Sequence, residues 1–572
     1  MAEKLTNEQQ AAVDSRERSL LVSAAAGSGK TKVLVERLFS YVEREGANLD
    51  DFLIITYTRA AASELRGKIA KALTERMERD PGNYHLRQQM LRVYRADIKT
   101  VDAFCTALLR ENCHLLGEDA RGHALRPDFR VLDENEAQVL RERVLARTLD
   151  DFYDHLTPGG TLLADTLGAG RDDSALEDLV LELHAKLQAQ PYEDKWLDAQ
   201  RAFWRAVPDK IEDTPYGKIL LNEVRRKARH CKNLLQRAAQ EMCANDALNQ
   251  KYAPAFLDAS YQLEALEGKT AEGWDAARGV TIAFPRLAAV KDSDGGEMKA
   301  RMKSLWDNCK ETVKGFAEIF SASSDEAVED LRTMAPAMLA LIDLTADFSR
   351  RYNEEKRRRN SADFSDQEHE AIRLLIGEDG APTELARIVS ARYREIMVDE
   401  YQDTNEVQNR IFDAISCKGE NLFTVGDVKQ SIYRFRLADP RIFLQHYNTW
   451  PPLEDAEEHD SAKLLLSRNF RSRKEVLDAT NFIFCNILSE EMGELDYGAD
   501  EMLRLGANYV ESSACGAEFH LLDLPTQTGE QRVRASEAEA AFVADYISDM
   551  LTSEFAIQDD KTKELRPVRE EE

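Results

Sequence analysis

The chain lacks the features that mark membrane-bound and exported proteins. No run of apolar residues approaches the roughly 20 residues of a membrane-spanning helix. The first ten residues, MAEKLTNEQQ, contain no apolar core of the kind found in signal peptides. The 8 cysteines form no CxxC pair, which argues against a zinc site, an iron–sulfur cluster and a disulfide framework. We therefore expect reduced thiols, a cytoplasmic protein and no membrane partner.

Positively charged residues are outnumbered by negatively charged ones. There are 76 Lys and Arg residues against 104 Asp and Glu residues, and the net charge of −28 argues against a protein that coats nucleic acid by bulk attraction. A narrow basic groove on an acidic body is still compatible with this balance. The 572 residues, of which 31% are charged and 43% hydrophobic, give room for about three or four globular domains.

A phosphate-binding loop near the N-terminus is the clearest motif that the sequence contains. Apolar residues 20–22 predict a buried strand and residues 32–38 predict a helix, with a loop of small residues ending in Gly-Lys-Thr between them. Backbone N–H groups and a helix N-terminus can bind phosphate there, because no bulky side chain blocks the approach. Lys30 would reach the β- and γ-phosphates, and the Thr31 hydroxyl would ligate Mg²⁺. Ala24 stands where the strict motif has Gly, and a flexible Gly-Ser loop before a helix is the plain alternative.

Further short apolar runs alternate with helical patterns and predict an α/β fold with a doubly wound parallel sheet. Such a sheet binds its ligands at the carboxyl ends of the strands. Strands at residues 464–466 and 519–524 and a helix over 536–551 would belong to a second α/β domain. The expected strands of the first part are 52–56, 98–100, 396–398 and 422–426.

The stretch from about residue 111 to 363 has a different character. Apolar residues recur there at spacings of three and four, which predicts amphipathic helices, for example over 134–152, 175–188, 222–243 and 296–320. Breaks are expected near Pro158-Gly159-Gly160 and near 292–296. Basic clusters at 225–227 and 356–359 are interpreted as solvated helix faces. This stretch reads as an inserted helical domain.

Polar residues with distinct chemistry follow the strands that resume after this insertion. Asp399 and Glu400 follow strand 396–398, where Asp399 can hold Mg²⁺ and Glu400 can orient and deprotonate a water molecule. Gln430 follows the next strand, where an amide could sense a γ-phosphate. Aromatic and basic residues then alternate from Tyr433 to Arg436, which suits stacking on bases, although burial of Tyr433 in the core is an equal alternative.

These motifs occur in an order that resembles the superfamily 1 DNA helicases of the UvrD/Rep type. Within that family the chain is most similar to the AddA group of helicase–nucleases, on the wording QSIYRFR and on residues 127–133 and 363–366. The stretches that match the wider family are Thr6–Gln10, Ala24–Thr31, Thr56–Arg66, Thr100–Cys105, Val398–Asn405, Val425–Arg436 and Asn469–Ser472.

The resemblance implies a recA-like P-loop NTPase lobe in two parts, 1–112 and 363–450. An all-helical domain, 113–362, is inserted between them, and 451–572 begins a second, incomplete recA-like lobe. The resemblance further implies that the chain is the N-terminal portion of a longer protein, and no nuclease domain is expected within it.

The resemblance also implies roles for individual residues. Catalysis would rest on Lys30, Asp399, Glu400, Gln430 and the arginine finger Arg471, and Mg²⁺ would be held by Thr31 and Asp399. ATP would be bound by Gln9, Ala24, Ala25, Ala26, Gly27, Ser28, Gly29, Lys30, Thr31, Lys32 and Phe470, the last in place of the usual Tyr. Single-stranded DNA would lie along Tyr57, Arg59, Thr100, Phe435 and Arg436. Arg59 stands where Asn is usual, and Asp102, where His is often found, is not expected to touch DNA.

The implied activity is that of an ATP- and Mg²⁺-dependent DNA helicase or translocase with 3′-to-5′ polarity, acting in double-strand break repair and recombination. Its partners would be single-stranded DNA, duplex ends and a second, AddB-like protein of a helicase–nuclease complex. Two alternatives remain open at this point. One is a stand-alone repair helicase of the UvrD/Rep type, and the other is a nucleotide- and DNA-binding module that does not translocate.

Overall fold

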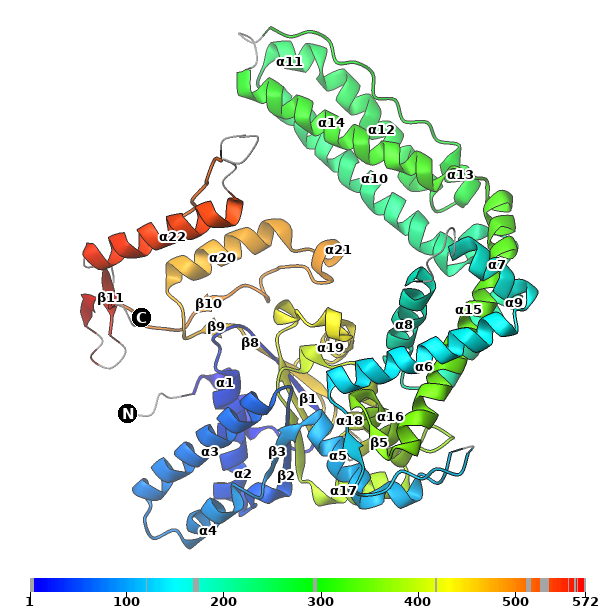
Figure 1. Cartoon of the computed structure of the whole chain (residues 1–572). Helices are drawn as coiled ribbons and strands as arrows, with labels where there is room; N and C mark the ends of the chain where they lie inside the picture. Colours follow the sequence, from blue (N-terminus) through cyan, green and yellow to red (C-terminus); the bar gives the residue numbers. More distant parts are fainter. Residues whose placement is uncertain are drawn as a thin grey trace. The chain divides into compact units, whose positions relative to one another are not determined.

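The computed structural model describes residues 5–119, 121–167, 174–291, 296–416, 419–510, 516–524, 534–553, 555–559, 562 and 564–569. The chain divides into two compact units (Figure 1). The first unit joins Met1–Asp133 to Lys356–Glu572, and the second is Glu134–Glu355. In the described ranges no helix is long and apolar enough to cross a membrane.

A six-stranded, entirely parallel sheet forms the centre of the first unit. Its strand order is β3-β2-β6-β7-β1-β8, so β1 lies between two strands that come some 400 residues later in the chain. Every residue of β1, β2, β6 and β7 is buried, as expected for a parallel sheet covered on both faces. The strands are β1 (Leu20–Ala24), β2 (Phe52–Thr56), β3 (Asp97–Thr100), β6 (Glu395–Val398), β7 (Leu422–Gly426) and β8 (Ala462–Leu466).

The helices of this unit begin where the sequence supplies caps. Thr6 and Gln9 form a capping box at the start of α1, and Asp363 and Asp366 form another at α16. The helices around the sheet are α1 (Asn7–Asp14), α2 (Lys30–Glu45), α3 (Arg59–Arg79), α4 (Tyr84–Arg92), α5 (Val101–Asn112), α16 (Phe364–Leu375), α17 (Glu384–Arg392), α18 (Glu406–Ile415) and α19 (Pro440–Thr449).

The sheet continues past the boundary expected at residue 451. Strand β8 was expected to open a second lobe, but it pairs with β1 along its whole length, from Leu20 opposite Ala462 to Ala24 opposite Leu466. The expected strand at 519–524 is wrong as well, because residues 516–524 form no strand. The elements after β8 are β9 (Arg468–Asn469), α20 (Lys474–Ile487), α21 (Glu490–Gly493), β10 (Arg504–Leu505), α22 (Ala535–Thr552), β11 (Ala556–Gln558) and β12 (Leu565–Pro567).

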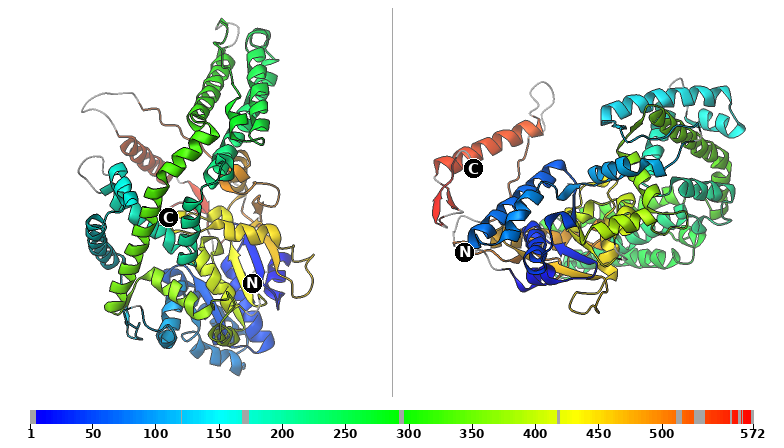
Figure 2. Two further views of the ribbon diagram at one scale, coloured as in Figure 1. Left: turned by 90° about the vertical axis from the view of Figure 1, so that its right-hand side faces the viewer. Right: turned by 90° about the horizontal axis from the view of Figure 1, so that it is seen from below.

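The second unit is helical, as the periodicity predicts. Helices α10, α12 and α14 lie side by side and share a core in which the rings of Phe256 and Trp306 stack 4.8 Å apart (Figures 1 and 2). The helices are α6 (Glu134–Asp154), α7 (Pro158–Leu167), α8 (Ser174–Gln188), α9 (Glu193–Arg205), α10 (Pro215–Met242), α11 (Asp246–Lys251), α12 (Ala253–Lys269), α13 (Trp274–Arg278), α14 (Gly296–Ile319) and α15 (Ser324–Arg358).

The break expected near Pro158-Gly159-Gly160 lies between α6, which ends at Asp154, and α7, whose first turn these three residues form. Proline is tolerated at the first position of a helix, because its missing N–H would have no partner there. Gly159 is required by packing rather than by a turn, since a Cβ atom at this position would lie 2.3 Å from the carbonyl oxygen of Pro336 in α15. The other expected break, near 292–296, lies mostly outside the described residues.

The insertion leaves and rejoins the first unit at one place. Strand β4 (Arg130–Val131) pairs in parallel with β5 (Ser361–Ala362), so the exit and return of the chain lie side by side. Lys356 corrects the interpretation of cluster 356–359 as solvated, because its side chain is 1% exposed and its ammonium group lies 2.9 Å from Asp363 and 2.7 Å from Asp366. The acidic side chains of 363–366 thus fix this return point.

Candidate functional site

The loop between β1 and α2 has the backbone of a phosphate cradle. Gly27 and Gly29 have φ values of +68° and +85°, a region that favours glycine. Gly29 is the N-cap of α2 and offers no side chain to its first N–H groups. Because the first N–H groups of a helix have no partner within it, they remain available to an anion.

A second segment closes over this loop from the carboxyl end of β8. The Asn469 side-chain amide donates a hydrogen bond to the carbonyl oxygen of Ala26 at 2.7 Å. The backbone N–H of Phe470 donates a hydrogen bond to the carbonyl oxygen of Gly27 at 2.9 Å. A Cβ atom at Gly27 would lie 2.8 Å from the Asn469 amide nitrogen and 2.9 Å from the Cβ of Arg471. The predicted arginine finger therefore begins beside the phosphate loop, with an exposed side chain.

Lys30 and the two predicted catalytic carboxylates meet at the same edge of the sheet. The Lys30 ammonium group lies 2.7 Å from Glu400 Oε2. Asp399 precedes Glu400 at the end of β6, and burial, reinforced by the negative charge of Glu400, raises the pKa of Asp399 to about 6. A buried carboxyl group beside a second carboxylate is a position that a cation would stabilise.

The donor set fits a magnesium nucleotide. Thr31 and Asp399 supply oxygen ligands, and the loop N–H groups supply donors to phosphate. The buried Ser28 hydroxyl has no hydrogen-bond partner among the described residues. Within the described ranges, no group of three or more His, Cys, Asp or Glu side chains is placed to hold a metal ion by itself. Mg²⁺ would not need such a group, because it usually takes one or two protein carboxylates and completes its shell with water and phosphate oxygens.

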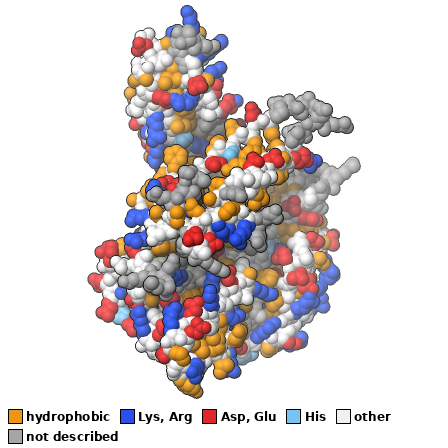
Figure 3. Space-filling view, turned by 90° about the vertical axis from the view of Figure 1, so that its left-hand side faces the viewer, with side chains coloured by type: hydrophobic (Ala, Val, Ile, Leu, Met, Phe, Trp, Pro, Cys, Tyr) orange, Lys and Arg blue, Asp and Glu red, His pale blue; other side chains and the backbone are white. Residues whose placement is uncertain are grey.

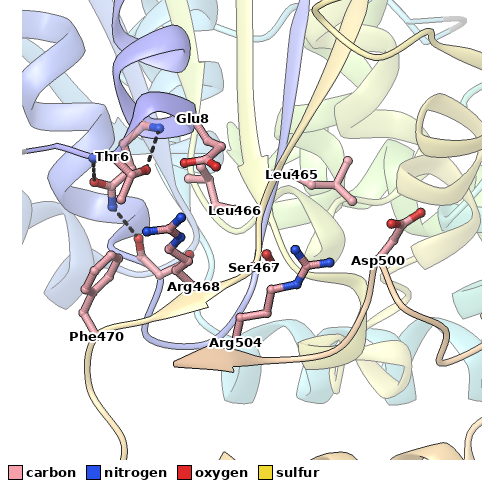
Figure 4. A pocket seen from close by; sticks show the side chains of 11 residues that line it. Thr6, Glu8, Leu465, Leu466, Ser467, Arg468, Phe470, Asp500 and Arg504 are labelled. Carbon is pink, nitrogen blue, oxygen red and sulfur yellow. Dashed lines mark hydrogen bonds between the residues drawn. The ribbon is translucent and has the colours of Figure 1, made fainter. Parts of the chain in front are cut away.

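A cavity of about 200 Å³ lies beside the loop (Figure 4). The cavity is lined by residues of α1, by the end of β8 and by residues near 470 and 504. Phe470 is one of the lining residues. Gln9 is 3% exposed, and its Nε2 donates to the Ser28 carbonyl oxygen at 2.9 Å while its Oε1 accepts from the backbone N–H of Thr6. An amide has a second N–H and a second lone pair, so Gln9 can still read a base edge.

Gln430 lies in a short 3₁₀ turn after β7. Its Nε2 donates to Asp427 Oδ2 at 2.7 Å. Lys32 lies in the first turn of α2, as the motif predicts.

Three of the five predicted DNA-binding residues line one groove of about 770 Å³. Tyr57 and Arg59 follow β2, Thr100 is the last residue of β3, and residues of α5 and α16 also line the groove. The Tyr57 hydroxyl is hydrogen-bonded to that of Thr404 in the turn after β6. Asp102 lines the same groove. The pKa of its carboxyl group is raised, because the effect of burial exceeds the opposing effect of the positive charge of Arg59.

The other two DNA-binding residues lie after β7. Phe435 is 74% exposed, and its ring lies 5.9 Å from that of Tyr433. Exposed aromatic rings are the side chains on which proteins stack single-stranded bases. The Arg436 side chain lies outside the described residues. Basic and acidic side chains are interspersed over the face shown in Figure 3.

Comparison with known proteins identifies the family. Residues 5–451 match the UvrD/REP helicase N-terminal domain. The chain belongs to the UvrD/REP helicase family. It is also 34% identical to the AddA subunit of the ATP-dependent helicase/nuclease of Ruminiclostridium cellulolyticum, over 99% of this chain and 46% of that protein. Proteins of the same name from Acetivibrio thermocellus (35% identity, 94% of this chain, 44% of the relative) and Bacillus cytotoxicus (34%, 99% and 46%) are similar to it as well.

The chain thus spans slightly less than half the length of these relatives. The matched region contains five of the six strands of the central sheet and ends before β8. The resemblance stated from the sequence is confirmed, both for the family and for its AddA group.

Two residues that contribute to this UvrD/REP site had no predicted role. Asn469 is 2% exposed and joins the segment after β8 to the phosphate loop. Gln402 is 1% exposed and contacts Glu400. Both residues lie within stretches that resemble the family's motifs. The sequence contains no pattern from which the hydrogen-bond partners of a buried amide can be predicted, so the role of each residue follows only from its contacts in the structure.

Proposed function

We propose that this chain is the ATP-hydrolysing part of a DNA helicase or translocase. The observation that carries the proposal is the 2.7 Å contact between Lys30, on the phosphate loop, and Glu400, after β6. It brings a phosphate-binding cation and a carboxylate able to activate water to one edge of the sheet.

Each residue has a proposed task at this edge. Lys30 and the loop N–H groups bind the β- and γ-phosphates, and Thr31 and Asp399 hold Mg²⁺, which supplies charge neutralisation when bound. Glu400 orients the attacking water and accepts its proton, which requires that Lys30 turn from the carboxylate to the phosphate. Gln430 senses the γ-phosphate, and Arg471 stabilises the charge that develops during transfer. Gln9, Lys32 and Phe470 hold the nucleoside.

The nucleic-acid substrate is proposed to be single-stranded DNA with access to duplex ends. The groove with Tyr57, Arg59 and Thr100 supports this, as does the exposed ring of Phe435. Because the relatives are named as one component of a helicase/nuclease, we extend the proposal to 3′-to-5′ translocation in recombinational repair with a second, AddB-like component.

The test is ATP hydrolysis by the full encoded protein with and without single-stranded DNA. Lys30→Ala and Glu400→Gln should each abolish the DNA-stimulated rate, and Glu400→Gln should still bind ATP. Equal hydrolysis by Lys30→Ala and wild type would overturn the site. DNA-stimulated hydrolysis without strand displacement or movement along DNA would instead support the binding-module alternative.

A further inference from the structure

Gln402 connects the proposed water-activating carboxylate to the segment that carries Gln430. It lies in the 3₁₀ turn Tyr401–Asp403, two residues after Glu400. Its Nε2 donates to Glu400 Oε2 at 2.9 Å, and its Oε1 accepts from the backbone N–H of Asp427 at 2.9 Å.

The orientation of this amide follows from its partners. The backbone N–H of Asp427 can only donate, so the amide oxygen must face Asp427 and the amide nitrogen must face Glu400. Gly426 leaves space for this arrangement, because a Cβ atom there would lie 2.5 Å from Gln402 Oε1. The backbone carbonyl oxygen of Gln402 also accepts a hydrogen bond from the Ser431 hydroxyl at 3.3 Å.

The position of the Glu400 side chain depends on the hydrogen bonds that its carboxylate accepts. Its backbone is left-handed, with φ of +54°, and its side chain is 42% exposed. The side-chain donors to its carboxylate in the described part of the chain are Lys30 and Gln402. If Lys30 binds phosphate, as proposed above, Gln402 is the donor that remains.

The contact also belongs to a longer series of hydrogen bonds. Lys30 contacts Glu400, Glu400 accepts from Gln402, and Gln402 accepts from the Asp427 backbone. Asp427 Oδ2 in turn accepts from Gln430 Nε2. The series joins residues after β1, β6 and β7.

We propose that Gln402 is a positioning residue that holds the Glu400 carboxylate against the attacking water and ties it to the segment of Gln430. The inference rests on the proposed ATP hydrolysis. Because a displacement of about 1 Å can cost roughly a hundred-fold in rate, loss of this hydrogen bond should lower kcat without weakening nucleotide binding.

Three variants of the full encoded protein test the proposal. Gln402→Glu keeps an oxygen acceptor for the Asp427 N–H but replaces the donor to Glu400 with a second carboxylate oxygen. Gln402→Met removes both contacts with a similar side-chain length. Gly426→Ala keeps glutamine at position 402 but displaces its side chain, because the new Cβ would lie 2.5 Å from Gln402 Oε1. Each should lower the DNA-stimulated kcat by about ten- to a hundred-fold, with KM for ATP and affinity for DNA within two-fold of wild type.

A double variant, Gly426→Ala with Gln402→Met, should be no slower than the slower single variant, since both changes break the same contact. A kcat for Gln402→Glu within two-fold of wild type would overturn the inference, even if Gln402→Met is slow, because donation to Glu400 would then be dispensable. Glu400→Gln is measured in the same series. If it hydrolyses ATP normally, the proposed function fails, whereas a dead Glu400→Gln with a normal Gln402→Glu defeats the positioning role alone.

Discussion

The side-chain amide of Asn469 donates a hydrogen bond to the carbonyl oxygen of Ala26, 2.7 Å away, and so joins the segment after the last strand of the sheet to the phosphate loop. The same side chain accepts hydrogen bonds from the backbone N–H groups of Arg471 and Ser472, at 2.8 and 2.7 Å. One buried amide therefore sets both the loop and the start of the arginine-finger segment.

Asn469→Asp should weaken binding of a nonhydrolysable ATP analogue by about ten-fold. The carboxylate can still accept from Arg471 and Ser472, but it cannot donate to Ala26, whose carbonyl oxygen then lacks its partner at a cost of about 1–3 kcal/mol. Fluorescence titration of the analogue measures the change. Asn486→Asp, on the exposed face of α20, is the matched control and should leave the affinity unchanged.

Arg37→Met should lower the free energy of unfolding by about 3–5 kcal/mol, because it leaves the buried carboxylate of Glu395 without its cation. The Arg37 side chain is fully buried, and its Nε lies 2.8 Å from Glu395 Oε2. This ion pair joins α2 to β6, so urea unfolding of the first unit reports it. Arg44→Met breaks an exposed pair with Asp14 and should cost no more than about 1 kcal/mol. Equal losses in the two variants would contradict a buried contribution.

His446 should make the protein less stable in mild acid. Burial lowers the pKa of His446 from 6.5 to about 4, and its ring stacks on Trp450 at 4.3 Å. The neutral ring is therefore favoured by the fold. Its contribution to stability is fully present above pH 6.5 and is lost as the pH falls toward 4, and the loss reaches about 3 kcal/mol at pH 4.

His446→Phe keeps the stacking ring and cannot titrate, so its unfolding free energy should fall less between pH 7 and pH 4 than that of the wild type. Denaturant unfolding at a series of pH values measures the difference. The exposed His155→Phe is the control, and it should follow the wild-type curve. Parallel curves for His446→Phe and wild type would show that this ring does not contribute.

Phe435→Ala should weaken binding to single-stranded DNA by about ten- to a hundred-fold, since stacking on one base is worth about 1–3 kcal/mol. Fluorescence anisotropy with a labelled oligonucleotide measures the affinity. Phe482→Ala is matched to it, because Phe482 is 73% exposed and Phe435 74%. If both variants lose affinity equally, the ring of Phe435 has no specific role.

Much of the first unit could be predicted from local patterns. Continuous apolar runs mark β1, β2, β6 and β7, because a parallel strand is buried on both faces. The residues after these strands, such as Lys30 and Glu400, could then be placed at one edge by topology alone. Their contact at 2.7 Å supports that reasoning.

Other features depend on distant contacts and could not be predicted. The apolar run 464–466 fits any parallel sheet, and only pairing with β1 assigns it to the first one. Gly159 looks like a turn residue, yet it is needed because α7 packs against the backbone of Pro336. Lys356 resembles the exposed Arg358 and Arg359 in the sequence, and its burial follows from Asp363 and Asp366.

The placement of β1 has a consequence for how the chain is made. Residues 20–24 leave the ribosome early, but their two neighbours in the sheet, 422–426 and 462–466, are synthesised about 400 residues later. The helices of residues 134–355 contact one another over much shorter separations, and such local contacts form sooner. The helical unit is therefore able to fold during synthesis. The phosphate loop can make its contact with Asn469 only after that residue has left the ribosome.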